Sequence, residues 1–163
     1  MTRKKSILRA PSVKVAAERA LPLLGKALLG EKPPHPVKQL ASRDAPLVER
    51  LRRLCLSFPE AGERLSHGEP TWFAGKGKVF AMLDNHHHGS RHLSVWLPQP
   101  ADVQETLIEA DPGRFFRPPY VGPSGWVGVV LDTKPDWKML QQLLHAAFVH
   151  VATKKLVAQL VGP

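Results

Sequence analysis

Residues 71–83, which read TWFAGKGKVFAML, decide the fold class of this chain. Two runs rich in aromatic and aliphatic residues flank Gly75-Lys76-Gly77, and glycine tolerates the positive φ that a tight turn requires. The spacing predicts an antiparallel hairpin with a basic tip. Because further turn residues separate it from an apolar run at 91–97, the stretch 64–97 is predicted to form a β-meander.

Helices are predicted before and after the meander in the sequence. Asp44 is placed to cap a helix over residues 46–57, since apolar residues then recur at helical spacing until Pro59. After the meander, the sequence predicts a second helix, a buried strand and a long C-terminal helix, at 100–110, 126–131 and from Pro135 onward. Strands grouped between helices, without βαβ alternation, favour an α+β fold in a single compact domain.

The positive charge is concentrated at the start of the chain. The formal net charge is +9, of which residues 1–44 supply +7. Three prolines in residues 31–36 predict an extended linker, which follows a possible short helix. We therefore expect a basic extension over residues 1–45 and a folded domain over residues 46–161. A cationic arm attracts polyanions such as DNA, and salt weakens this attraction.

Several classes of function find no support in the sequence. Cys55 is the only cysteine, so an intramolecular disulfide and a cysteine-built zinc site are excluded, and its helical neighbours favour a buried thiol. No apolar run is long enough to span a bilayer. No catalytic constellation is present, so we expect a non-enzymatic protein without cofactor or metal. The single cysteine and the lack of a membrane-spanning run predict a cytoplasmic protein without a membrane partner.

Two segments resemble the MmcQ/YjbR family. The first runs from Phe58-Pro59-Glu60-Ala61-Gly62-Glu63 through residues 68–73 to Lys78-Val79-Phe80, and the second is residues 117–127, RPPYVGPSGWV. The second is similar to the family's Pro-Tyr-x-Gly-x-x-Gly-Trp element. The resemblance implies a fold compared with CyaY and with double-wing DNA-binding modules. Residues 1–45 lie outside it, and suspected DNA binding is the only function it implies.

Basic and aromatic residues define a candidate nucleic-acid surface. Such surfaces combine cations that contact phosphates with rings on which bases can stack. Tyr120 lies in a proline- and glycine-rich loop, where its hydroxyl could equally anchor the loop. The predicted contacts are Lys76, Lys78, Arg91, Arg117 and Tyr120 in the domain, with Arg3, Lys4 and Lys5 in the tail.

A ligand pocket is the main alternative. His67 and Glu69 share one face of a predicted strand, and an acid beside a histidine can exchange protons, although a strand-end hydrogen bond is the simpler interpretation. The predicted lining is His67, Glu69, Trp72, Arg117 and Tyr120. Consecutive histidines at 86–88 point to alternating sides, which favours a polar loop over a metal site.

These observations predict a DNA-binding protein with little sequence specificity. The alternatives are a small-ligand or protein-binding module using a pocket near Trp72 and Tyr120, or an uncharacterised enzyme. The distribution of basic residues separates the first two classes. Lysines and arginines gathered on one face would favour DNA, whereas a concave pocket beside Glu69 would favour a ligand. The sequence does not define the oligomeric state.

Overall fold

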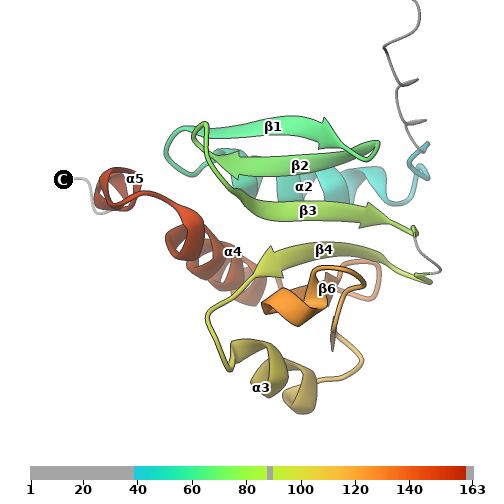
Figure 1. The fold of residues 1–163 in the computed structure, drawn as a ribbon. Helices are drawn as coiled ribbons and strands as arrows, with labels where there is room; N and C mark the ends of the chain where they lie inside the picture. The colour runs from blue at the N-terminus through green and yellow to red at the C-terminus, as the bar shows by residue number, and fades with distance from the viewer. Residues whose placement is uncertain (1–38, 88–89, 161–163) are drawn as a thin grey trace, which may run out of the picture. The chain divides into compact units, whose positions relative to one another are not determined.

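A computed structural model describes residues 39–87 and 90–160 of the chain. Over these residues the chain forms a six-stranded antiparallel sheet in the order β1-β2-β3-β4-β6-β5, accompanied by four α-helices (Figure 1). The strands are β1 Ala61–Ser66, β2 Glu69–Ala74, β3 Val79–Asn85, β4 Leu93–Pro98, β5 Phe115–Phe116 and β6 Trp126–Val130. The helices are α2 Ala45–Leu56, α3 Val103–Ala110, α4 Trp137–Val151 and α5 Lys154–Gln159, with a 3₁₀ turn η1 at Gly122–Ser124.

Two helices cover one face of the sheet. Figure 1 shows α2 behind β1–β3 and α4 behind β3 and β4. Their buried residues include Leu51 and Cys55 of α2 and Leu140, Leu144 and Phe148 of α4. The ring of Phe148 stacks on Phe58 at 4.9 Å between centroids and meets Phe80 edge-on at 5.3 Å. The hydrophobic core therefore lies between these helices and the sheet.

Strand register assigns side chains to the two faces. Residues paired directly across antiparallel strands point to the same side. One row joins Leu83, Val95, Val129 and Phe115, all buried against the helices. The neighbouring row runs across the whole sheet on the other side, through Arg64, Thr71, Met82, Trp96, Gly128 and Phe116. In the described residues no helix covers β1–β3 on this second side, which we call the open face.

The predicted α+β class is confirmed, and most predicted elements are present. The helix expected at 46–57 is α2, and residues 74–79 form the expected hairpin turn. The sequence did not predict β1 as a strand from Ala61, or the two-residue β5. The C-terminal helix was predicted as one element, but it is interrupted at Ala152, and Thr153 caps α5 by accepting a hydrogen bond from the Leu156 amide.

The helix suggested near residues 13–29 and the proline-rich linker lie outside the described residues. Within residues 39–87 and 90–160, no helix has the length and apolar character needed to cross a membrane.

Candidate functional site

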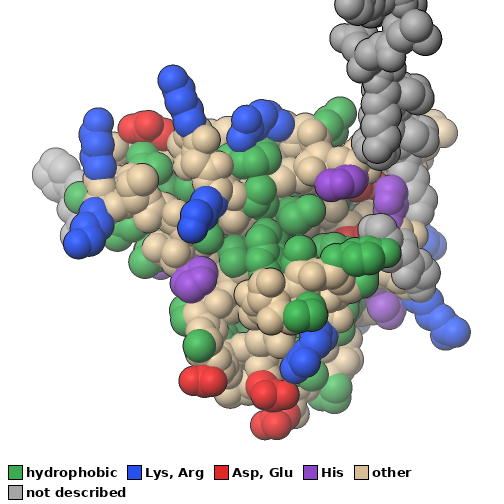
Figure 2. Space-filling model, viewed as in Figure 1, with side chains coloured by type: hydrophobic (Ala, Val, Ile, Leu, Met, Phe, Trp, Pro, Cys, Tyr) green, Lys and Arg blue, Asp and Glu red, His purple; other side chains and the backbone are tan. Residues whose placement is uncertain are grey.

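The open face contains a pocket of about 390 Å³. Its floor comes from β2, β3 and β4, and the loop after β5 forms one wall. Figure 2 shows hydrophobic side chains exposed across the middle of this face, with histidines near its edge. The lining residues are Ser66, His67, Glu69, Met82, Leu83, Asp84, His87, Trp96, Tyr120 and Val121.

Two buried carboxylates line this pocket. Glu69 is 6% exposed and Asp84 is 3% exposed. His87 joins them, because its Nε2 lies 2.9 Å from Glu69 Oε1 and its backbone amide donates to Asp84 Oδ1 at 3.2 Å. A polar chain continues along β4, where Trp96 Nε1 donates to Ser94 Oγ at 3.1 Å. The floor is thus an ordered polar network within mainly apolar walls.

The loop carrying Tyr120 is fixed by the helix beneath it. Gln104 of α3 donates one hydrogen bond to the Gly122 carbonyl at 2.8 Å and another to the Trp126 carbonyl. Tyr120 adopts a positive φ of 64° and its side chain is 78% exposed. His67, on the other side of the pocket, also has a positive φ of 54°. Such backbone conformations are costly for residues other than glycine and occur often at binding sites. His67 lies in the turn between β1 and β2, so the prediction that His67 and Glu69 share one strand is wrong.

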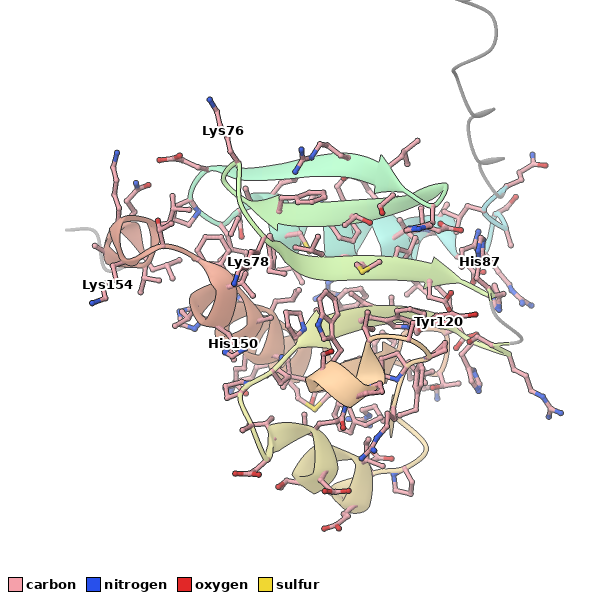
Figure 3. The ribbon with its side chains drawn as sticks, viewed as in Figure 1. Lys76, Lys78, His87, Tyr120, His150 and Lys154 are labelled. Carbon is pink, nitrogen blue, oxygen red and sulfur yellow. The ribbon has the colours of Figure 1, made fainter. Side chains whose placement is uncertain are left out.

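A second hollow of about 410 Å³ adjoins the first. It shares His87 and Trp96 with the open-face pocket and extends past Phe116 and Pro119 toward Arg91. Figure 3 shows His87 and Tyr120 at the end of the sheet away from the β2–β3 turn. These two hollows therefore lie toward that end of the sheet.

Basic residues gather at the other end. Lys76 and Lys78 lie on the β2–β3 hairpin, and Lys154, at the start of α5, lies at the same end of the sheet (Figure 3). Figure 2 shows Lys and Arg side chains over this end, with an acidic side chain among them, whereas further acidic side chains lie over α3. All three lysines are exposed, as is Lys155. We call these four lysines the hairpin-end cluster.

Packing holds the two parts of this cluster together. A Cβ built on Gly75 would lie 3.3 Å from Leu156 Cδ1, so α5 packs directly against the hairpin turn. The Gly75 amide donates to the Glu60 carbonyl at 3.1 Å, and Gln159 Nε2 donates to Glu60 Oε1 at 3.2 Å. Within residues 39–87 and 90–160, the ion pairs formed include none of the four lysines.

The predicted nucleic-acid contacts are not all brought together. Lys76 and Lys78 share the hairpin, but Arg91 lies in the loop before β4, beside the second hollow. Arg117 NH2 lies 3.2 Å from Glu105 Oε1, which pairs it with α3. Arg3, Lys4 and Lys5 lie outside the described residues. Lys154 and Lys155 were not predicted as contacts, because the sequence pattern placed them within one continuous helix.

Three of the five predicted pocket residues line the pocket, and two do not. His67, Glu69 and Tyr120 are in the lining. Trp72 points to the helix-covered side, is fully buried, and donates to Glu63 Oε2 at 3.0 Å. Arg117 lies against Gly122, where a Cβ would overlap its side chain. Trp96, Met82 and Asp84 were missed, because a strand pattern does not say which face is left uncovered.

The histidines at 86–92 do not form one cluster. His86 Nε2 lies 3.5 Å from Asp44 Oδ2, His87 faces Glu69, and His92 Nδ1 lies 3.1 Å from Asp132 Oδ1. His88 lies outside the described residues. Among the residues that are described, no group of three or more His, Cys, Asp or Glu side chains could hold a metal ion.

Cys55 is buried in the core, away from the pocket. Burial raises the pKa of its thiol well above the ordinary value, and the nearby Glu63 carboxylate raises it further. A thiol held in its neutral form is a poor nucleophile. Its place against the sheet therefore agrees with packing and not with catalysis.

Fold and site together define an α+β protein with one helix-covered and one open sheet face. The sequence model of the YjbR family matches residues 56–150, which is more than half of the chain. The protein belongs to the YjbR family, as its motifs predicted. It is also similar to the crystal structure of Deinococcus radiodurans protein DR2400, described as a DUF419 domain. That similarity has a TM-score of 0.57 and 22% identity over 71% of this chain and 88% of that one. No curated protein matches the sequence.

Proposed function

We propose that this protein binds nucleic acid with little dependence on sequence, through the hairpin-end cluster and its basic N-terminal extension. The observation that carries the proposal is that Lys76, Lys78 and Lys154 all lie at one end of the domain. These lysines come from segments far apart in the chain, and the contact between α5 and Gly75 keeps them together.

The charge distribution supports a polyanion as the partner. Residues 45–163 carry only +2 net, so a cluster of four lysines makes one end locally positive while α3 remains acidic. Exposed lysines act as mobile point charges that contact phosphates without reading bases. This chemistry accounts for affinity and orientation on the polymer, and it predicts little sequence preference.

A hairpin charge reversal tests the proposal. We expect the double variant Lys76→Glu with Lys78→Glu to bind duplex DNA at least about tenfold more weakly. The negative slope of log K against log salt concentration should become shallower by about 0.9 for each phosphate that the variant no longer neutralises. Lys134→Glu with Lys138→Glu is the matched control, because it makes the same change in net charge. Lys138 lies in the first turn of α4, and that helix spans about 22 Å before α5 begins.

The two double variants separate specific placement from net charge. Equal weakening of both would show that only total charge matters, and unchanged affinity of the hairpin variant would remove this end from the binding surface. Circular dichroism and thermal unfolding should show that both variants retain the wild-type fold, because the substituted side chains are exposed.

The N-terminal extension is expected to supply most of the affinity. It carries +7 of the +9 net charge, and tethering it to a weak site on the domain raises the effective concentration of that site. At one fixed salt concentration, affinity should fall in the order full-length protein, peptide of residues 1–43, and a truncated chain from Asp44. A truncated chain that binds as tightly as the full protein would contradict this role.

A further inference from the structure

We infer that the open-face pocket binds a small organic cation, an ammonium or amidinium group carried on an aromatic body. This site is separate from the nucleic-acid surface proposed above. Its sign of charge is opposite and it lies at the other end of the sheet, since β3 separates Lys78 from Asp84 by about 20 Å.

The polar part of the pocket selects for positive charge. Glu69 and Asp84 are both buried in its floor, on adjacent strands. The other titratable side chains in the lining are His67, His87 and Tyr120, and His87 Nε2 lies 2.9 Å from Glu69 Oε1. Arg64 shares the open face but lies over the Phe73 ring at 3.7 Å and is not in the lining. The lining therefore contains two carboxylates and no lysine or arginine.

The apolar part selects for a flat, polarizable body. Trp96 and Tyr120 provide two aromatic side chains, and Met82 and Val121 complete the apolar surface between them. Aromatic faces attract cations, and thioethers make favourable contacts with rings. Tyr120 is held at the rim by the Gln104 anchor below its loop. The pocket thus combines aromatic walls with a carboxylate floor, which together recognise an organic cation.

The size of the pocket agrees with a compact ligand. A volume of about 390 Å³ is at the lower end of the range for small-molecule sites, about 300–1,000 Å³. A single ring with a short charged group fits this volume. A polyanionic phosphate chain would meet the two carboxylates and be repelled.

A charge series of nearly identical shape tests the inference. Benzamidine, benzamide and benzoate share one ring and differ in charge. We expect benzamidine to bind the full-length protein saturably at pH 8, measured by ligand-observed NMR and calorimetry. Benzamide should bind about 10- to 100-fold more weakly, as expected when one charge-assisted hydrogen bond is removed, and benzoate should not saturate.

Substitutions locate the binding to this pocket. Glu69→Gln and Asp84→Asn should each weaken benzamidine binding about tenfold or more. Glu109→Gln, on the exposed surface of α3, is the matched control and should have no effect. Tyr120→Ala should weaken binding about two- to fivefold, through removal of one aromatic wall. Because Tyr120 is mostly exposed, this variant keeps the test valid even if a carboxylate substitution prevents folding.

Three results would overturn the inference. They are benzamide binding as tightly as benzamidine, full affinity in the folded Glu69→Gln and Asp84→Asn variants, and no saturable binding of any probe. DNA affinity of Glu69→Gln, measured in parallel, should equal that of the wild type. A failure of the pocket is therefore distinguishable from a failure of the nucleic-acid proposal.

Discussion

The two faces of the sheet are built from the same strands but differ in their side chains and in their surroundings. On the helix-covered face, Leu83, Val95 and Val129 meet a closed aromatic and aliphatic core. On the open face, the next residue along β3 is the carboxylate Asp84 and the next along β4 is Trp96. Because strand side chains alternate, one set of residues can stabilise the fold while its neighbours stay available for binding.

The largest expected difference between the faces is in stability. Phe148→Ala should lower the free energy of unfolding by about 3–5 kcal/mol, because the ring is fully buried against Phe58 and Phe80. Met82→Ala, on the open face, should lower it by about 1 kcal/mol or less, since its side chain is only half-buried. Urea denaturation measures both values. Equal losses of stability would show that the open face is part of the core.

One position of the open face should nevertheless resist change. Gly128 lies beneath the Phe116 ring, and a Cβ there would come within 2.6 Å of both Cε atoms. Gly128→Ala should therefore cost about 1–3 kcal/mol through overpacking. In a Phe116→Ala background the same substitution should cost much less, and a double-mutant cycle measures this coupling. Additive effects would mean that the two residues do not meet.

The buried thiol should make stability sensitive to alkaline pH. The pKa of Cys55 is higher in the folded than in the unfolded chain, so its stabilising effect is complete below the unfolded pKa and is lost as pH rises toward the folded pKa. The wild type should therefore lose stability progressively as the pH rises above the unfolded pKa of the thiol. The test compares the free energy of unfolding as a function of pH in the wild type and in Cys55→Ala. Parallel profiles would place the thiol in solvent.

A more local effect is expected at the hairpin end. Thr153→Ala removes the hydroxyl that accepts from the Leu156 amide and should cost about 1 kcal/mol, mostly in α5. Hydrogen exchange should then speed up about fivefold in α5 and hardly change in α4. Uniform acceleration in both helices would mean that α5 does not open independently of the core.

The sequence predicted the elements better than their assembly. Helical spacing around Leu51 and the glycines at 75 and 77 identified α2 and the hairpin, because these signals are local. The start of β1 was missed, because Glu63 and Arg64 interrupt the apolar pattern and the predicted meander began only at residue 64. The break at Ala152 was missed because no proline or glycine marks it, and only the cap at Thr153 separates the helices.

The candidate sites show the same limit. A register irregularity lies between Trp72 and Phe73, and the side to which each points depends on pairing with distant strands. The sequence therefore placed Trp72 in a pocket whose tryptophan is Trp96. Lys154 lies at the same end of the domain as Lys76 because α5 packs on Gly75. That contact joins segments about 80 residues apart in the sequence. Local patterns do not contain that information.

A crossed titration tests whether the chain carries two separate surfaces of opposite charge. DNA and benzamidine affinities are measured for wild type, the Lys76→Glu with Lys78→Glu variant, and Glu69→Gln, all at one salt concentration and pH 8. If the surfaces are separate, the hairpin variant loses affinity for DNA alone and Glu69→Gln loses affinity for benzamidine alone. Loss of both affinities in either folded variant, or of neither in both, would contradict the separation.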